Sequence, residues 1–437
     1  MTARGADWLA RAEKTISAGL VYDWPNVPVE KAQGCRVWGT DGKVYIDFCS
    51  GMASVNTGHC HPRVVAAVKD QAEKLIHGPV GVLLYEPLVA LAEELGGVTP
   101  EGLDQFFFLN SGSEAVEGAV KLARYVTGRP AVVSFVGGFH GRTMGAVALT
   151  TSKSKYRRHY EPLMGGVYNI PFPYCFRCPY GLQPKTCGTR CFDAVTRLFD
   201  NVVEPDEVAA FIIEPIMGEG GYAPAPRDYL GMLREVTSRH GIMLIFDEIQ
   251  TGFGRTGRMF AADTFGVTPD IMTVAKGIAS GMPLSAVVAG RDTMSRWTAG
   301  AHGTTFGGNP LSCAAARATL RVLEEENLLD NARAMGERAM TFLSALADRY
   351  PLVGDVRGEG LMIGIELVDQ ADGQAPNPKA VEAVLAECFA GGLILYPCGT
   401  YGQVIRFIPP LVVTARELDQ GLSVLERAIA KVSAGGR

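Results

Sequence analysis

The 437-residue sequence lacks several features that mark whole classes of protein. No stretch approaches about 18 consecutive apolar residues, so no membrane-spanning helix is expected. The N-terminal segment has no apolar core of the kind found in secretory signals, and its Asp7 and Glu13 argue against a transit peptide. The sequence also shows no internal repeat and no low-complexity segment.

A strong excess of one charge is also missing. The 41 Lys and Arg residues nearly balance 46 Asp and Glu, for a net charge of −5, and no run of five or more like charges occurs. We therefore expect neither a nucleic-acid partner nor a membrane partner. The ten cysteines stand in a long chain without a signal peptide, which favours reduced thiols and a cytoplasmic location over a disulfide framework.

What the chain does contain is typical of a globular protein, with 47% apolar and 20% charged residues. Between about residues 62 and 310, helical patterns alternate with short, continuously apolar runs. Continuous apolarity indicates strands buried on both faces, and the alternation predicts an α/β fold with a mostly parallel sheet. The runs are 106–110, 131–136, 208–215, 242–248, 270–276 and 285–290.

The two ends of the chain have a different pattern. A leading helix is followed by short strands with a turn at Thr40-Asp41-Gly42, and two long helices after residue 311 precede a mixture of strands and helices. We predict a large domain at 61–314. The segments 1–60 and 315–437 are expected to combine into a smaller α+β domain.

Ligands bind at the carboxyl ends of the strands in an open parallel sheet, so the residues that follow each run are informative. The runs lead into an anion-binding turn, an aromatic residue with His and Arg, two separate acids and a lysine. These residues are Ser111-Gly112-Ser113, Phe139, His140, Arg142, Glu214, Asp247-Glu248 and Lys276. Five successive strands would thus deliver complementary chemistry to one edge of the sheet.

Each of these residues has a simpler explanation when taken alone. Ser111 could only cap a helix, Asp247 could sit in a loop ion pair, and Lys276 could be an ordinary solvated lysine. Together, however, they supply a phosphate-binding turn, a stacking aromatic, a buried acid and a desolvated amine. That combination is what pyridoxal phosphate requires.

One motif points elsewhere and is rejected. Residues 252–257, GFGRTG, match the GxGxxG fingerprint of dinucleotide-binding folds. Five polar-leaning residues separate the motif from its strand, no clean helix follows, and no acid lies about 20 residues further on. No GxxxxGK[ST] sequence occurs, so a P-loop is not expected.

The motifs IFDEIQTGFGRTG (245–257) and AKGIASGMPLSAVVA (275–289) carry a specific resemblance. The chain resembles the class III pyridoxal-phosphate aminotransferases of fold type I, which include 4-aminobutyrate, ornithine and acetylornithine aminotransferases. The resemblance covers nearly the whole chain. It implies pyridoxal 5′-phosphate as cofactor and a large domain with a mostly parallel sheet.

The resemblance also implies roles for individual residues. Lys276 would join the cofactor covalently and move the proton, and Asp247 would hold the pyridine nitrogen. Gln250 would bind the phenolic oxygen of the ring, with Phe139 and Ile249 on its two faces. Thr305 would reach the phosphate of a neighbouring subunit, which implies a homodimer with shared active sites. The whole predicted cofactor set is Ser111, Gly112, Ser113, Phe139, His140, Glu214, Asp247, Ile249, Gln250, Lys276 and Thr305.

Four residues are predicted to contact substrate by the same resemblance. Arg406 matches an arginine that grips an α-carboxylate, and Glu219 matches a glutamate that neutralises it when the donor has none. Arg142 matches an arginine that holds a distal carboxylate. Met52 stands where 4-aminobutyrate enzymes often carry isoleucine. Met217 replaces a common glutamine and is expected to make the pocket wall less polar.

These residues predict transfer of an amino group from an ω-amino acid, with 4-aminobutyrate as lead candidate, to a 2-oxo acid such as 2-oxoglutarate by ping-pong transamination. A racemase or epimerase on the same fold is the alternative. A decarboxylating transaminase and a cofactor-binding scaffold without turnover are smaller possibilities.

A cysteine-rich segment departs from the family pattern. The spacing C-x2-C-x8-C-x3-C of Cys175, Cys178, Cys187 and Cys191 could ligate zinc or an iron–sulfur cluster. Thiols in a loop near the site are favoured, and no metal is assigned.

Overall fold

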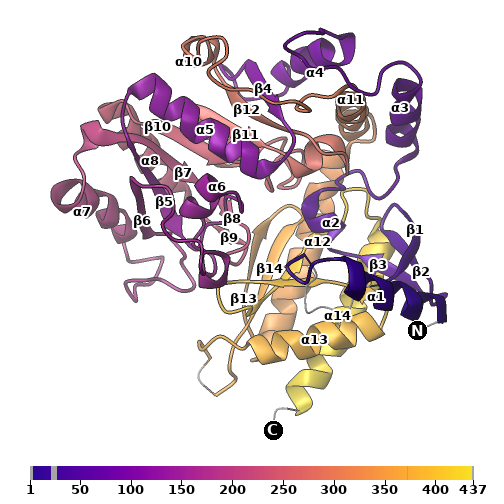
Figure 1. The fold of residues 1–437 in the computed structure, drawn as a ribbon. Coiled ribbons are helices and arrows are strands. Elements are labelled where there is room, and N and C mark those ends of the chain that lie inside the picture. Colours follow the sequence, from indigo (N-terminus) through magenta and orange to yellow (C-terminus); the bar gives the residue numbers. More distant parts are fainter. Residues whose placement is uncertain (1–2, 21–26, 372, 436–437) are drawn as a thin grey trace.

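The computed structural model describes residues 3–20, 27–371 and 373–435 (Figure 1). Its largest element is a seven-stranded sheet with the order β4-β12-β11-β10-β7-β5-β6. The strands are β4 (Gln105–Leu109), β5 (Ala131–Val136), β6 (Val167–Pro171), β7 (Val208–Ile213), β10 (Met243–Asp247), β11 (Ile271–Val274) and β12 (Ser285–Ala289).

The predicted mostly parallel sheet is confirmed. Neighbouring strands β6, β5, β7, β10 and β11 pair in parallel, whereas β12 runs antiparallel to both β11 and β4. All six apolar runs form strands. The edge strand β6 was missed, because its residues are mostly half-exposed and a one-sided edge strand lacks a continuous apolar run.

Both faces of the sheet are buried, as continuous apolarity requires. On one face, Ile245 packs in a cluster with Ala119 and Ala123 of α5 (Gly112–Thr127). On the other, Phe246 belongs to a cluster that includes Leu230 of α8 (Arg227–His240). Since successive side chains of a strand point to opposite faces, one apolar run supplies both clusters.

The two ends of the chain combine in smaller sheets. Strands β1 (Val29–Gln33), β2 (Arg36–Gly39) and β3 (Val44–Asp47) form a sheet with β15 (Leu393–Ile394), which pairs in parallel with β3. The predicted turn between β2 and β3 is confirmed. A second sheet has the order β13-β14-β17-β16 and comprises β13 (Val353–Glu359), β14 (Met362–Leu367), β16 (Tyr396–Cys398) and β17 (Val404–Phe407).

Long helices accompany the C-terminal strands. They are α11 (Pro310–Glu325), α12 (Leu328–Arg349), α13 (Pro378–Ala390) and α14 (Ala415–Gly435), and Figure 1 shows the last two beside the N-terminal strands. The two chain ends thus share one sheet, in which β15 pairs with β3. The division into a large domain at 61–314 and a smaller domain of 1–60 and 315–437 stays a prediction.

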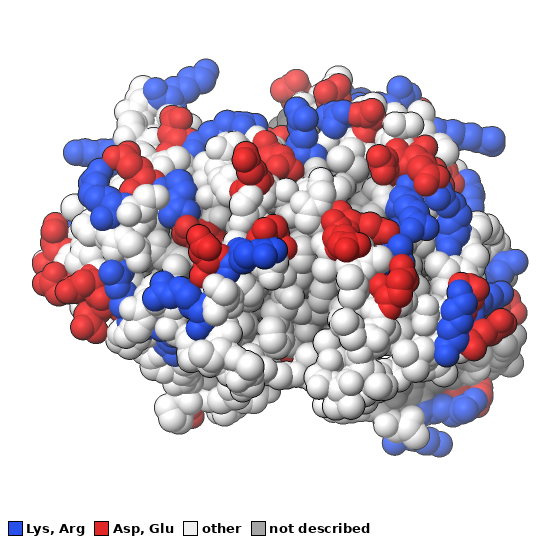
Figure 2. All heavy atoms as spheres, turned by 90° about the horizontal axis from the view of Figure 1, so that it is seen from above, with Lys and Arg blue, Asp and Glu red and all other residues white. Residues whose placement is uncertain are grey.

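The remaining α-helices and strands are shorter. They are α1 (Ala3–Thr15), α2 (Ser50–Ala53), α3 (Pro62–Ala72), α4 (Glu86–Gly96), α6 (Met144–Leu149), α7 (Asp193–Asn201), α9 (Ala261–Phe265), α10 (Arg291–Met294), β8 (Ile216–Met217) and β9 (Ala223–Pro224). Within the described ranges, none of these or the longer helices has the length and apolarity needed to cross a membrane. Figure 2 shows basic and acidic side chains intermingled on one face of the molecule.

Candidate active site

A cavity of about 710 Å³ lies at the carboxyl ends of the central strands. Its wall includes the ends of β4, β5, β7, β10 and β11, together with residues from the N- and C-terminal segments. The predicted site residues in this wall are Met52, Ser111, Gly112, Ser113, Phe139, His140, Arg142, Glu214, Glu219, Asp247, Ile249, Gln250, Lys276 and Arg406. The structure therefore brings together every predicted site residue except one.

The exception is Thr305. Its side chain is exposed, in a loop that does not border this cavity. Contact with a neighbouring subunit's site stays a prediction for this residue.

The buried acid at the end of β10 is paired with a histidine. Asp247 Oδ2 lies 2.7 Å from Nδ1 of His140, and both side chains are almost completely buried. Burial opposes protonation of His140, but the hydrogen bond and charge of Asp247 prevail and raise its pKa. The hydrogen bond to His140 therefore fixes the position of the Asp247 carboxylate at the end of β10.

The neighbouring acid, Glu248, has a different role. Its carboxylate accepts hydrogen bonds from the backbone N–H of Ala261 (3.0 Å) and Ala262 (2.7 Å) at the start of α9. Asp247 lines the cavity, whereas Glu248 does not. Only the first of these two adjacent carboxylates is thus available to a ligand.

Lys276 follows β11 and lines the cavity as predicted. Burial lowers the pKa of its amine to about 8, although Asp247 and Glu214 act in the opposite direction. A substantial fraction of the amine is consequently neutral near physiological pH. Its φ of 47° lies in the left-handed region, which is strained for a lysine and is found preferentially at functional sites.

The turn after β4 combines a helix cap with an anion-binding geometry. Ser111 Oγ accepts from the N–H of Glu114 (3.3 Å), and Glu114 Oε2 accepts from the N–H of Ser111 (2.7 Å). The side chain of Ser111 is therefore a helix cap, which was its simpler explanation. A β-carbon on Gly112 would lie 2.9 Å from Ile249 Cδ1, so only glycine lets the first turn of α5 approach this wall.

Two more side chains, Glu214 and Gln250, line the cavity. Glu214 accepts from the N–H groups of Phe139 (2.9 Å) and Gly218 (3.0 Å) and so ties two loops together. Burial raises the pKa of Glu214. Among the described residues, Gln250 Oε1 is buried and has no hydrogen-bond partner, which leaves this amide with bonding capacity for a bound group.

An ion pair between Glu219 and Arg406 also lines the cavity. Arg406 in β17 is 2% exposed, and its guanidinium pairs with Glu219 Oε2 while Nε donates to the carbonyl of Pro397 (3.1 Å). Burial disfavours the charge of Glu219, but Arg406 and Lys153 outweigh it and lower its pKa to about 2.

Sequence reasoning missed two side chains that hold this pair. Glu219 Oε1 accepts from Lys153 Nζ (2.8 Å) and from the hydroxyl of Tyr156 (2.9 Å). Tyr156 also lies beneath Arg142, whose guanidinium carbon is 4.4 Å from the ring centroid. Neither residue ends a strand or forms part of a quoted motif, so the sequence carried no signal for them.

Met52 lines the cavity as expected, but the expectation for Met217 is wrong. Met217 lies in β8 behind the wall and is buried against two glycines. A β-carbon at Gly137 would lie 2.7 Å from its sulfur, and one at Gly220 would lie 2.5 Å away. Met217 thus fills space between backbones and does not set the polarity of the cavity.

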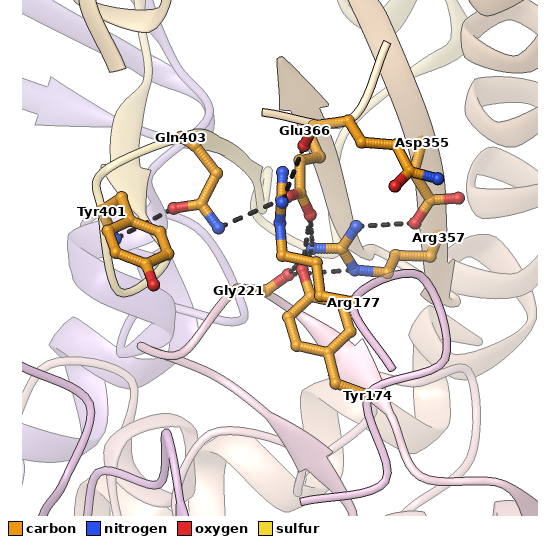
Figure 3. A network of polar contacts seen from close by, with 9 residues as sticks. Tyr174, Arg177, Gly221, Asp355, Arg357, Glu366, Tyr401 and Gln403 are labelled. Atoms are coloured by element: carbon orange, nitrogen blue, oxygen red, sulfur yellow. Dashed lines mark hydrogen bonds and ion pairs between the residues drawn. The ribbon is translucent and has the colours of Figure 1, made fainter. Parts of the chain in front are cut away.

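None of the four clustered cysteines lines this cavity. Cys175 and Cys178 line a second cavity of about 1050 Å³. Figure 3 shows the adjoining polar network, in which Arg177 and Arg357 both pair with the buried Glu366. All four thiols are free, and within the described ranges no three His, Cys, Asp or Glu side chains are arranged to hold a metal.

The fold and the cavity define a class of protein. A mostly parallel sheet whose strand ends bring a buried lysine, an acid and an anion-binding turn together is the framework of a pyridoxal-phosphate enzyme of fold type I. The partly neutral Lys276, the unpartnered amide of Gln250 and the close approach at Gly112 all fit that cofactor.

The chain belongs to the aminotransferase class-III family, whose profile matches residues 21–429. It is 42% identical to 5-aminovalerate aminotransferase DavT of Pseudomonas putida over 93% of this chain and 94% of the relative. It is 40% identical to the 4-aminobutyrate aminotransferase GabT of Escherichia coli over 96% of this chain and 97% of the relative. The chain is therefore a pyridoxal-phosphate-dependent enzyme of this family.

Two further comparisons concern a racemase and a solved structure. The alanine/serine racemase of Pyrococcus horikoshii is 40% identical over 99% of this chain and 92% of the relative. Among solved structures, a PLP-bound amine transaminase from an uncultivated Pseudomonas species superposes with a TM-score of 0.90 at 31% identity, covering 96% of this chain and 99% of the other.

Proposed function

We propose that this enzyme transfers the amino group of an ω-amino acid of four or five carbons to a 2-oxo acid such as 2-oxoglutarate, in two alternating half-reactions. 4-Aminobutyrate is the lead donor. The observation that carries the proposal is the Glu219–Arg406 ion pair, which lines the same cavity as Lys276 and Arg142. The relatives named for 4-aminobutyrate and 5-aminovalerate support it.

The cofactor would be held by residues of the central sheet. Lys276 would bind it through Nζ, and the first-turn amides of Gly112 and Ser113 would bind its phosphate. Asp247 would hold the protonated ring nitrogen. Phe139 and Ile249 would cover the two faces of the ring, and Gln250 would bind its phenolic oxygen. Three further residues would position these groups. Ser111 would hold the phosphate-binding turn, His140 would hold Asp247, and Glu214 would hold the loop of Phe139.

When bound, pyridoxal phosphate supplies a ring that accepts the electrons released as a C–H bond breaks. Lys276 would move the proton in that step. Its Nζ, released when the amino group of the donor replaces it, would take the proton from the carbon that bears that amino group and deliver it to a carbon of the cofactor. A pKa of about 8 suits both directions of this transfer, because neither the charged nor the neutral amine predominates strongly near that pH.

Arg142 and Arg406 would each bind the carboxylate of a different substrate. A donor whose only carboxylate is distal would bind Arg142, while Glu219 neutralises Arg406. A 2-oxo acid has an α-carboxylate that requires Arg406, so Glu219 would rotate away and the planar guanidinium would take the carboxylate by two hydrogen bonds. Met52 would limit the space beside the donor.

A homodimer is part of the proposal. Thr305 would complete the partner's phosphate site. Several large apolar side chains are exposed on the segment 76–84 and at Phe306, whose ring lies 4.7 Å from that of His77. They are Ile76, Val82, Leu83, Leu84 and Phe306, with exposed fractions from 50 to 80%. A surface of this kind favours burial against a second copy. Light scattering on purified protein tests the assembly, and a monomer would contradict it.

The cytoplasmic location stays a prediction.

Single half-reactions test the donor. Holoenzyme is mixed with 4-aminobutyrate, 5-aminovalerate or alanine without an acceptor, and its visible absorbance is followed. Bleaching with the two ω-amino acids but not with alanine supports the proposal. Bleaching with alanine alone would overturn it.

The variant Arg406→Gln refines this test. Loss of Arg406 should slow the 2-oxo acid half-reaction by at least about tenfold more than the ω-amine half-reaction, since a charge-assisted pair is lost only in the former. Equal losses in both half-reactions would show that Arg406 is structural.

A racemase is the second candidate, favoured by the similarity to the alanine/serine racemase. It would use the same lysine and cofactor without releasing an oxo acid. Loss of optical rotation from a single L-amino acid, with no acceptor and no lasting bleaching, would establish it.

A further inference from the structure

Tyr156 contacts three side chains of the cavity at once. It ends the short 3-10 helix Ser154–Tyr156, which follows α6. Its hydroxyl donates to Glu219 Oε1 (2.9 Å), and its ring lies 4.4 Å below the Arg142 guanidinium. The edge of the ring also meets Phe139 at a centroid distance of 5.6 Å and an angle of 76°.

We propose that Tyr156 is a positioning residue that couples the two carboxylate subsites, holding Glu219 on Arg406 with its hydroxyl and Arg142 in the donor subsite with its ring. This inference deepens the proposed function and rests on it. Tyr156 would thereby favour the arrangement of the site that accepts an ω-amino acid over the one that accepts a 2-oxo acid.

The geometry gives the direction of the effect. Glu219 uses Oε2 for Arg406 and Oε1 for Tyr156 and Lys153 in the same rotamer. Any rotation that withdraws Oε2 from Arg406 also displaces Oε1 and stretches the bond from Tyr156. The hydroxyl therefore stabilises the paired arrangement selectively. Burial and Glu219 raise the pKa of Tyr156, so the phenol remains a donor at every working pH.

The ring acts on the other subsite. A guanidinium over an aromatic face is attracted by the ring quadrupole. The 4.4 Å distance to Tyr156 is shorter than the 5.9 Å from Arg142 to the Phe139 ring. Tyr156 is thus the main aromatic support of Arg142. One side chain consequently touches Arg142 and also Glu219, the partner of Arg406.

The variant Tyr156→Phe removes the hydroxyl and keeps the ring. Apparent dissociation constants are measured for both half-reactions from the dependence of their rates on substrate concentration. We expect the value for 2-oxoglutarate to fall and that for 4-aminobutyrate to rise, each by about threefold to tenfold, the net effect of one hydrogen bond. Tyr160→Phe is the matched control, because Tyr160 is exposed on the same loop and should change neither value.

A double-mutant cycle separates this role from a general structural one. In a Glu219→Ala background the shift caused by Tyr156→Phe should vanish, because the hydroxyl acts through Glu219. Tyr156→Leu, which also removes the ring, should weaken 4-aminobutyrate binding further than Tyr156→Phe does.

The outcomes distinguish two kinds of failure. If the wild type reacts with both substrates but Tyr156→Phe shifts both dissociation constants in the same direction, or leaves them unchanged, this inference is overturned and the proposed function stands. If the wild type reacts with no ω-amino acid, the proposed function is overturned and the inference fails with it.

Discussion

At the scale of single residues, position on a strand decides which ionisable group can do chemistry. Asp247 and Glu248 are adjacent and nearly completely buried, yet one lines the cavity and the other caps α9. Successive side chains at a strand end point in opposite directions, so only one of two adjacent acids can reach the site. Lys276 differs from an ordinary lysine for another reason, because burial lowers the pKa of its amine.

That lowered pKa makes a testable prediction about cofactor binding. The neutral amine is the reactive form, and its fraction rises about tenfold per pH unit below the pKa. The rate at which apoprotein recovers visible absorbance with pyridoxal phosphate should therefore rise with pH and level off near pH 8. Stopped-flow absorbance between about pH 6 and 10 provides the measurement.

The control for this profile is Lys276→Ala, which should show no protein-linked visible band and no turnover at any pH. A wild-type rate that continued to rise up to the ordinary lysine pKa of 10.5 would show that Lys276 is solvated. Turnover by Lys276→Ala at a comparable rate would show that another residue moves the proton.

At the scale of elements, the start of α5 serves stability and binding together. The reciprocal hydrogen bonds between Ser111 and Glu114 satisfy two end amides of the helix. The turn itself lines the cavity, where its remaining first-turn amides would bind a phosphate as proposed above. The cap and the anion-binding turn are therefore two parts of one short segment.

Ser111→Ala should cost about 1 kcal/mol of folding free energy, the usual value of a helix cap. It should also weaken binding of pyridoxal phosphate, since the amides of the first turn lose their fixed orientation. Urea unfolding of apoprotein and cofactor titration measure the two effects. Ser433→Ala is a suitable control because the buried hydroxyl of Ser433 has no hydrogen-bond partner among the described residues. Equal unfolding midpoints for the two variants would contradict the prediction.

The cysteine-rich loop makes a second prediction at this scale. Its four thiols are free and are not arranged around a common metal position within the described part of the chain. Purified protein should therefore contain neither zinc nor iron in stoichiometric amount, and chelation should not change its melting temperature. Elemental analysis by mass spectrometry measures this directly, and one zinc per chain would overturn it.

At the scale of the whole molecule, a fully buried arginine joins the central sheet to both chain ends. Arg255 donates to Asn56 Oδ1 (2.8 Å) from the N-terminal segment. From the C-terminal segment it reaches the carbonyls of Leu361 (3.2 Å) and Pro409 (2.6 Å). The glycine-rich sequence 252–257 thus serves as a junction. Its glycines permit the turn, since Gly254 and Gly257 have φ of 88° and 82°.

Arg255→Ala should destabilise the protein by at least about 3 kcal/mol, because several charge-assisted hydrogen bonds are lost and buried carbonyls remain unpaired. Differential scanning calorimetry or urea unfolding detects the loss. Arg258→Ala, on the exposed side of the same loop, should remain near wild type. A small loss for Arg255→Ala would mean that water replaces the guanidinium.

The sequence by itself determined the strands of the central sheet and the side chains at their ends. Both follow from local patterns, because a strand buried on two faces must be continuously apolar and its next residue lies at the sheet edge. The edge strand β6 escaped for lack of that pattern. Fourteen of the fifteen predicted site residues, all but Thr305, line the cavity. They were predicted either from their place after a strand or from the family motifs that contain them.

Only the tertiary structure decided how distant groups pair. Glu219 and Arg406 are separated by 187 positions, and Tyr156 joins Glu219 across 63. The position of Met217 behind the cavity wall, which differs from the expectation, depends on which backbone segments approach one another. The hydrogen bonds of Arg255 depend on the same packing. Hydrogen bonds and cation–π contacts act over a few ångströms and leave no periodic trace along a chain. Their partners appear only once packing of the central sheet against the chain ends has fixed their positions.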